Sequence, residues 1–276
     1  MRLVAPAADL HVHSTCSDGL DAPATLVNRA SGRLSLLSIC DHDTLRAYDD
    51  PATNANAIPG VRILPGIEIS AVVGDDELHI LGYFPSGLSA ELRAFVIGLE
   101  SARRCRILDG VAKLRARGLG LRLDLLEDVV GEGVPCRSHV CRALIRIGVA
   151  RNPAVVFRRF LGRDVFEPPE VSVAEAIEQI HRSQGIAIWA HPRIDHLSQH
   201  LATLLACGID GLEVDSPSRR GTDRRRLREL CVEHELLSTG GSDYHGAHNS
   251  THRQLGAWRF PIEYVPVALR CETPLC

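Results

Sequence analysis

The sequence is almost without lysine. Lys113 is the sole lysine among 31 basic residues, and 34 aspartates and glutamates bring the formal net charge to −3. A net charge of this size gives no general attraction to nucleic acids or to anionic membranes. The basic side chains that could bind an anion are therefore nearly all arginines, whose planar guanidinium group suits phosphate.

The sequence also lacks long apolar runs and paired cysteines. No run approaches the roughly 18 apolar residues of a membrane span, and the N-terminus has no signal-peptide core, so we expect a cytoplasmic protein without membrane association. The nine cysteines are an odd number with no CxxC pair, which favours free thiols in a reducing compartment. Hard ligands surround Cys16, so we interpret it as a small buried residue in preference to a metal ligand.

Short apolar runs that end in polar residues alternate with helical stretches over most of the chain. The runs predict buried strands at 7–13, 34–43, 61–70, 77–84, 185–192, 208–215 and 236–245. Apolar residues spaced three and four apart predict helices at 22–31, 173–184, 197–207 and 219–234. This alternation indicates a parallel α/β architecture, and about seven units favour a barrel over an open sheet. The run VVGDDELH predicts a hairpin as a local exception.

One long segment breaks this rhythm. Residues from about 88 to 170 carry helical patterns, first in ELRAFVIGLESARRCRILDGVAKLRARG and then at 137–147 and 153–161, and show no clear strand. The turn-rich run FEPPE closes the segment. We therefore predict a barrel built from 1–87 and 171–276, with 88–170 inserted as a helical lobe that contacts the substrate.

Candidate metal ligands gather near the ends of the predicted strands. They are six histidines and three carboxylates: His11, His13, Asp18, His42, Glu68, His79, His191, Asp243 and His245. Each motif alone has an ordinary explanation, such as a chance HxH or a turn in SDYH. In a (β/α) barrel, however, the C-terminal strand ends meet at one mouth, and burying so many ionisable groups together is costly without metal. We therefore predict a metal site.

The number and type of these ligands indicate more than one ion. A single zinc ion needs three or four ligands, so nine candidates imply two or three ions. Imidazoles and carboxylates without thiolates suit manganese, iron or zinc. Many two-metal barrel hydrolases bridge their ions with a carboxylated lysine, but Lys113 lies in the helical insertion. Glu68 is the natural replacement as the bridging ligand.

The charge of such a centre favours a phosphoester substrate over an amide. Three divalent ions, three carboxylates and one hydroxide leave a positive excess. A phosphate monoester dianion would neutralise this excess, whereas a neutral amide would not. The expected reaction is attack of a metal-bridging hydroxide on phosphorus, with the ions stabilising the developing charge.

The ordered motifs DLHVHSTCSDG, DHDT, GIEIS, HILGYF, AHP and GSDYHG resemble the PHP (polymerase and histidinol phosphatase) family along nearly the whole chain. The resemblance implies a distorted seven-stranded (β/α) barrel and a trinuclear site, often with manganese, and with iron, zinc or magnesium as alternatives. It further implies that Asp41 and Asp43 orient imidazoles. The resemblance also implies one set of ligands for each ion. The first ion would be held by His11, His13, Glu68 and Asp243, the second by Glu68, His79 and His191, and the third by Asp18, His42 and His245.

The insertion and the run CRSHVCRAL (136–144) resemble the branch that removes the 3′-phosphate from 3′,5′-nucleoside bisphosphates. Some members of this branch degrade short RNA from the 5′ end. The family motif RPH reads Arg137-Ser138-His139 here. The resemblance implies substrate contacts from Arg137, His139 and Arg193, and catalytic roles for His191, Arg137 and His139. Alternatively, Arg137 is a surface cation at a helix start and Arg193 a solvated loop residue.

We therefore expect a metal-dependent phosphatase that acts on a nucleotide, with no obligate protein partner. An exoribonuclease acting on short oligonucleotides is an alternative, and so is histidinol-phosphate phosphatase, which needs a pocket for an ammonium group. A non-enzymatic alternative is a degenerate PHP binding module. Lost ligands would mark that case, and all nine are present.

Overall fold

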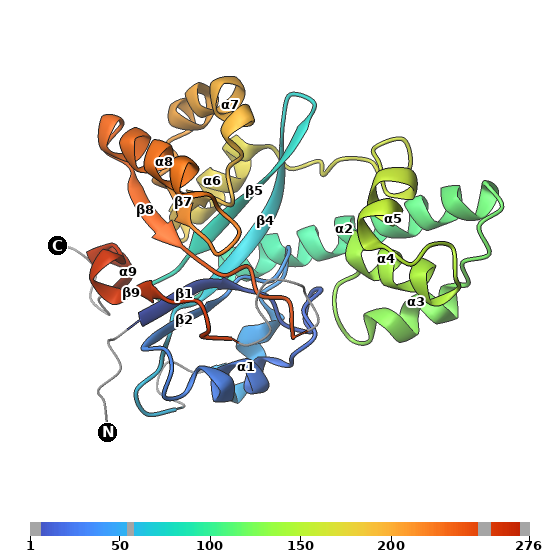
Figure 1. Cartoon of the computed structure of the whole chain (residues 1–276), viewed down its shortest axis with the longest axis horizontal. Helices are drawn as coiled ribbons and strands as arrows, with labels where there is room; N and C mark the ends of the chain where they lie inside the picture. Colours follow the sequence, from blue (N-terminus) through green and yellow to red (C-terminus); the bar gives the residue numbers. More distant parts are fainter. Residues whose placement is uncertain (1–6, 54–57, 248–254, 271–276) are drawn as a thin grey trace.

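The computed structural model describes residues 7–53, 58–247 and 255–270, in which the strands form two sheets. The four-stranded sheet has the order β3-β2-β1-β9, and the five-stranded sheet has the order β4-β5-β6-β7-β8 (Figure 1). The strands are β1 Ala7–Val12, β2 Leu36–Ile39, β3 Arg62–Ile63, β4 Gly66–Val73, β5 Asp76–Tyr83, β6 Ile186–Trp189, β7 Gly211–Asp215, β8 Leu237–Gly240 and β9 Phe260–Pro261.

Helices lie between most of these strands. They are α1 Pro23–Ala30, α2 Ala90–Ala116, α3 Leu123–Val130, α4 Arg137–Arg146, α5 Pro153–Phe160, α6 Val173–Arg182, α7 Ile194–Ala206, α8 Gly221–Glu233 and α9 Val267–Arg270. Local sequence explains several helix starts. The Ser89 and Ser172 side chains accept backbone N–H groups at the starts of α2 and α6, and proline begins α1 and α5.

The α/β class and the hairpin are confirmed, but the described residues contain no continuous closed barrel. Single bridges, Val12 to Tyr244 and His42 to Glu68, link the two sheets. The strand expected at 61–70 is divided at Pro65 into β3 and β4, because proline has no N–H for a ladder. Strand β5 is antiparallel to both β4 and β6, so the sheets are mixed.

Helices α2 to α5 have an apolar core of their own. Figure 1 shows α3, α4 and α5 grouped on one side of the sheets, with α2 running toward them. Ile107, Val111, Leu126, Val140 and Leu144 belong to this separate buried cluster. Helix α3 within this group was not expected from the sequence.

Arg103 joins this group of helices to the sheets. Its side chain is buried, and its Nε donates to Asp43 Oδ2 at 2.8 Å while its Nη2 donates to Ser70 Oγ at 2.5 Å. An ion pair buried in this way is costly to break, because the remaining partner would keep an uncompensated charge. The long helix α2 is thus fixed to β4 and to the segment after β2.

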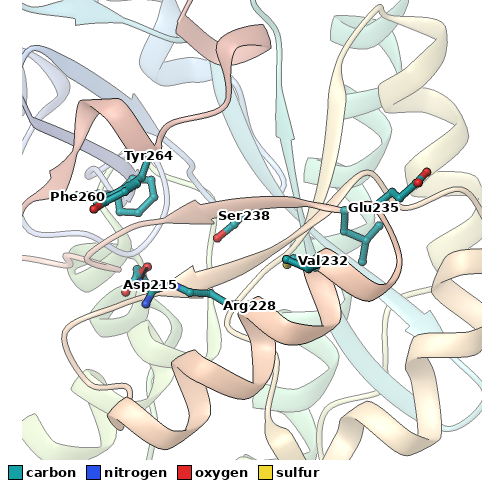
Figure 2. A pocket seen from close by; sticks show the side chains of 9 residues that line it. Asp215, Arg228, Val232, Glu235, Ser238, Phe260 and Tyr264 are labelled. Atoms are coloured by element: carbon teal, nitrogen blue, oxygen red, sulfur yellow. Dashed lines mark hydrogen bonds and ion pairs between the residues drawn. The ribbon is translucent and has the colours of Figure 1, made fainter.

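A cavity of about 540 Å³ lies between α8, β8 and the segment around Phe260 and Tyr264 (Figure 2). An ion pair between Arg228 and Asp215 crosses its lining, and none of the nine candidate ligands takes part in it. Among the described helices, none is both long and apolar enough to cross a membrane.

Candidate metal centre

The structure brings all nine candidate ligands together at one end of the strands. Strand β1 carries His11 next to its last residue and is followed directly by His13. The two rings point the same way because they are two residues apart. Strand β5 runs antiparallel to its neighbours, so His79 in its first half reaches the same end. The imidazoles pack as a continuous group, with ring centroids of His13 and His245 4.0 Å apart and those of His79 and His191 5.1 Å apart.

The first group of ligands surrounds the ends of His11 and His13. Their Nε2 atoms are 3.1 Å apart, and Glu68 Oε2 lies 3.4 Å from the first and 3.3 Å from the second. Asp243 Oδ1 is 3.2 Å from His13 Nε2. These atoms match the first expected set.

The second group surrounds the other oxygen of Glu68. Its Oε1 lies 2.9 Å from His79 Nδ1 and 2.9 Å from His191 Nε2, and these two nitrogens are 3.3 Å apart. Because the two carboxylate oxygens of Glu68 face different groups, this residue lies where a bridging ligand would lie.

The third group surrounds Asp18. Its Oδ1 is 3.2 Å from His245 Nε2, 3.7 Å from His13 Nδ1 and 3.9 Å from His42 Nε2. The other ring nitrogen of His42, Nδ1, is 2.9 Å from Glu68 Oε2. His42 therefore lies between Asp18 of the third group and the Glu68 oxygen Oε2 that faces the first group, and its ring atoms fit a site with either carboxylate.

The donor set fits divalent ions. Three buried atoms face the cluster without a hydrogen bond, namely Asp18 Oδ1, His42 Nδ1 and Glu68 Oε2. Buried polar atoms of this kind normally have partners, and a cation is the partner that carboxylate oxygens and imidazole lone pairs share. Three sets of ligand atoms lie close enough together to hold an ion: His13, Asp18, His42 and His245; His11, His13 and Asp243; and His42, Glu68 and His79. His191 is not in these sets, and its Nε2 lies 2.9 Å from Glu68 Oε1.

The electrostatics of the cluster agree with this fit. Burial alone would raise the pKa of Glu68, but the imidazoles of His42, His79 and His11 lower it well below its usual range. Burial lowers the pKa of His79, but Glu68 outweighs this and raises it to about 10. Likewise, Asp18 and Asp243 overcome burial and raise the pKa of His245 to about 10. The negative potential that raises the pKa of these imidazoles would also attract a divalent cation, whose binding would release their extra protons.

The backbone is unusual at several ligands. His191 and Asp243 have positive φ angles of 31° and 53°, a conformation that is uncommon for non-glycine residues. Gly241 is required for close approach of the chain, because a Cβ atom there would lie 2.2 Å from His11 Cβ.

Glu213 on β7 is a functional residue that the sequence analysis missed. Its Oε1 is 3.0 Å from His11 Nδ1, and its Oε2 accepts the backbone N–H of His191 at 2.7 Å. Contacts of this type fix the tautomer and the orientation of a ligating imidazole. The available signal was the charged residue in the middle of the run GLEVD, between Leu212 and Val214.

Asp41 and Asp43 do not orient imidazoles as expected. Asp41 accepts hydrogen bonds from Ser14 and Ser17 and so orders the loop that carries Asp18. Asp43 accepts from the Ser70 amide and from Arg103. The expectation is therefore wrong for Asp43, while Asp41 reaches an imidazole only through Ser17, whose Oγ donates to Asp41 and lies 3.5 Å from His13 Nδ1.

Arg137 and Arg193 lie beside the second group of ligands. Both line a cavity of about 330 Å³ that also includes His79, His191 and a third arginine, Arg163. Each of the three arginines is partnered by an acidic group: Arg137 by Glu77 at 3.1 Å, Arg193 by Asp195 at 2.5 Å and Arg163 by Asp76 at 3.2 Å.

His139 and Cys16 occupy supporting positions. His139 is buried, and its Nδ1 accepts the backbone N–H of Cys136 at 2.9 Å, which closes the first turn of α4. A direct substrate contact by His139 stays a prediction. Burial raises the pKa of the Cys16 thiol to about 11, which agrees with its interpretation as a packed residue, and the seven described cysteines are free thiols.

Comparison with known proteins identifies relatives along most of the chain. The 5′-3′ exoribonuclease Rnm of Salmonella typhimurium is 34% identical over 255 residues, covering 86% of this chain and 84% of the relative. A 3′,5′-nucleoside bisphosphate phosphatase of Chromobacterium violaceum is 30% identical, covering 86% of each chain. No family model matches the sequence.

A solved structure shows the same arrangement. A protein from Bifidobacterium adolescentis, assigned as a metal-dependent phosphoesterase, superposes with a TM-score of 0.81 at 29% identity, covering 95% of this chain and 94% of that one. The relatives and the His/Asp/Glu cluster together show a divalent-metal-dependent phosphoric ester hydrolase. This chain belongs to the PHP family of metal-dependent phosphoesterases, in the branch of the 5′-3′ exoribonucleases and the nucleoside bisphosphate phosphatase.

Proposed function

We propose that the protein removes the 3′-phosphate from 3′,5′-nucleoside bisphosphates. The observation that carries this proposal is the cavity lined by Arg137, Arg163 and Arg193 directly beside His79 and His191. A substrate with two phosphates can place one at the metal centre and the other among these guanidinium groups. The relative from Chromobacterium violaceum supports the same substrate class.

The proposed centre holds three ions, with manganese as the expected metal. His11, His13, Glu68 and Asp243 would hold one ion, Glu68, His79 and His191 the second, and Asp18, His42 and His245 the third. Bound ions supply Lewis acidity and activate water at neutral pH. The protein contributes the fixed directions of the ligands, because Glu213 holds His11 and the backbone of His191.

The arginines provide binding of the second phosphate. Arg137 lies at the start of α4, where His139 closes the first helical turn, so its guanidinium group is positioned by the helix. On binding, a phosphate dianion would replace Glu77 as the partner of Arg137 or share the guanidinium group with it. Arginine suits this exchange since its planar donors bind phosphate oxygens in pairs.

The fold and domain organisation expected from the sequence are part of the proposal. Strands β1, β2 and β4 to β8 would form a distorted seven-stranded barrel, in which the single bridges between the sheets are the seams. Residues 88–170 would be the substrate lobe inserted between 1–87 and 171–276, and their separate apolar cluster supports this division. The free thiols of the described cysteines support a cytoplasmic location.

The test compares substrates on manganese-loaded protein. We expect adenosine 3′,5′-bisphosphate to be hydrolysed with a higher kcat/KM than histidinol phosphate, AMP or a 5′-phosphorylated trinucleotide. Fastest turnover of histidinol phosphate would overturn the proposal, because an arginine-lined cavity is a poor place for an ammonium group. Fastest turnover of the trinucleotide would favour an exoribonuclease, the activity named for the relative that is 34% identical.

Two arginine variants test the role of the cavity. Arg137→Ala should raise KM for adenosine 3′,5′-bisphosphate about tenfold or more and leave the KM for a substrate with a single phosphate nearly unchanged. Arg158→Ala is the matched control, since Arg158 is an exposed arginine in the last turn of α5, outside this cavity. Equal effects of the two substitutions would contradict the role given to Arg137.

A further inference from the structure

A second cavity lies beside the third group of ligands and differs in character from the arginine-lined cavity beside the second group. Its volume is about 390 Å³, and two candidate ligands of the third group, Asp18 and His245, form part of its wall. The remaining lining residues come from the loop after β1 and from the helical insertion: Leu20, Ser138, Cys141, Arg142, Ile145, Pro153 and Phe157. Most of this wall is apolar.

Two of the apolar side chains that line this cavity, Phe157 and Leu20, are not part of an apolar core. Phe157 is 42% exposed and Leu20 is 43% exposed. Phe157 lies on α5 beside Val156, which packs into the core of the helical insertion, whereas Phe157 does not belong to that core. Large apolar side chains that stay accessible next to an active site indicate a binding surface.

Leu20 is fixed by the segment that contains His245 and Gly246. Its backbone N–H donates to the carbonyl oxygen of His245 at 3.0 Å. Gly246, with a φ of 117°, leaves room for this side chain, because a Cβ atom at that position would lie 2.6 Å from Leu20 Cβ. The wall opposite α5 is therefore held in place by the same segment that carries His245.

We infer that this cavity is the nucleobase subsite, with the base packed against Phe157 and Leu20. This inference rests on the proposed function. In a nucleoside bisphosphate the ribose carries the phosphates and the base in different directions. When one phosphate lies at the metal centre, the second phosphate and the base therefore need two separate cavities beside it. The cavity with three arginines suits the second phosphate, and the apolar cavity with an accessible aromatic ring suits the base.

The volume and chemistry of the cavity agree with this occupant. About 390 Å³ lies within the usual range of small-molecule pockets. Arg142 is the one guanidinium group among its described lining residues, against three in the other cavity, and its Nη2 donates to the Asp18 carbonyl oxygen at 3.0 Å. Stacking on an aromatic ring tolerates every base, so we expect preference for a base as such with weak discrimination between bases.

The test uses a substrate pair that differs only in the base. Adenosine 3′,5′-bisphosphate is compared with the abasic ribose analogue that carries both phosphates, on wild-type protein and on Phe157→Ala. We expect the substitution to raise KM for the adenosine substrate about tenfold with kcat nearly unchanged, and to leave KM for the abasic analogue unchanged. Phe157→Tyr, which keeps the ring, should behave as wild type.

A matched control separates this effect from general damage. Tyr264→Ala removes an exposed aromatic ring from the cavity remote from the ligands (Figure 2) and should change neither KM. Equal losses on both substrates in Phe157→Ala, or no loss on either, would overturn the base subsite.

Failure of the base subsite is distinguishable from failure of the proposed function. Binding of AMP is measured by calorimetry without turnover. If wild type hydrolyses neither bisphosphate but binds AMP about tenfold more tightly than Phe157→Ala does, the subsite stands and the phosphatase proposal falls. Equal AMP binding by the two proteins would overturn the subsite whatever the activity.

Discussion

Glu213 Oε1 lies 3.0 Å from Nδ1 of His11, deep inside the protein and away from solvent. Nδ1 can therefore carry the proton of this imidazole, which leaves the lone pair of Nε2 directed at Glu68 and His13. The second carboxylate oxygen of Glu213 accepts the amide of His191. One buried residue thus positions parts of two ligand groups.

Replacing Glu213 should weaken metal binding. In Glu213→Gln the amide cannot accept from both His11 and the His191 backbone, so we expect a 10- to 100-fold loss of manganese affinity, roughly the range for residues that support ligands. Calorimetric titration of metal-free protein measures the change. Glu229→Gln on the exposed face of α8 is the control, and unchanged affinity in Glu213→Gln would contradict the role.

Ser138 should control the ion held by Asp18. Its Oγ donates to Asp18 Oδ2 at 2.6 Å, which leaves Oδ1 facing His245. Removing this contact in Ser138→Ala frees the carboxylate to rotate, so we expect about a tenfold loss of affinity at one ion. Metal counting at limiting manganese detects it. Ser138→Thr should restore binding and Ser101→Ala, on α2, should not alter it; a normal metal count in Ser138→Ala would speak against the coupling.

Arg103 should stabilise the junction between α2 and the sheets. Loss of its charge in Arg103→Met leaves Asp43 buried without its partner, which costs roughly 3–5 kcal/mol of unfolding free energy. Denaturant unfolding of metal-free protein provides the measurement. Arg104→Met removes the adjacent exposed arginine and should change stability by less than about 0.5 kcal/mol. Similar values for the two variants would refute a special role for Arg103.

Acid should destabilise the protein partly through His139. Burial lowers the pKa of this imidazole to about 4 from its usual 6.5, so the folded protein keeps it neutral while the unfolded chain takes up a proton. Its contribution to stability is complete above pH 6.5 and is lost as the pH falls toward 4. Between pH 7 and pH 5 this loss is about 2 kcal/mol.

The His139→Gln variant tests this pH dependence. Glutamine can accept the same N–H of Cys136 at this helix position but does not titrate. Urea unfolding at pH 7 and pH 5 should therefore show a smaller loss in the variant than in wild type. Parallel losses in the two proteins would mean that other groups cause the acid sensitivity.

The sequence predicted the ligand cluster well because its signals are local. Three motifs and their order can be recognised without knowledge of long-range packing. They are HxH on a strand and DHD and SDYH at strand ends. Glu213 was missed because this acidic residue inside the run GLEVD has no partner nearby in the sequence. His11, its partner, lies 202 positions away.

Other parts of the molecule depend on the packing of distant elements. Arg103 looks like its neighbours Arg104 and Arg106 in the sequence, yet it shares the buried face of α2 with Leu99 and Ile107. The helical spacing could have identified Arg103, because residues four apart on α2 lie on the same face as Leu99 and Ile107. Closure of the strands into a barrel could not be predicted reliably, because it depends on how the edges of the two sheets meet beyond Pro65.

The proposal that Glu68 bridges two ions of a catalytic metal centre is tested most directly by measuring metal content and phosphate release together in Glu68→Gln. Glu68 presents one oxygen to each of two ligand groups, so we predict that the variant loses more than one ion per chain. We also predict that its hydrolysis of adenosine 3′,5′-bisphosphate falls by a factor of at least about 1,000. Metal-free wild type should be equally inactive and should recover with manganese. A Glu68→Gln protein that retains the wild-type metal content and hydrolyses the substrate at the wild-type rate would contradict the bridging role of Glu68.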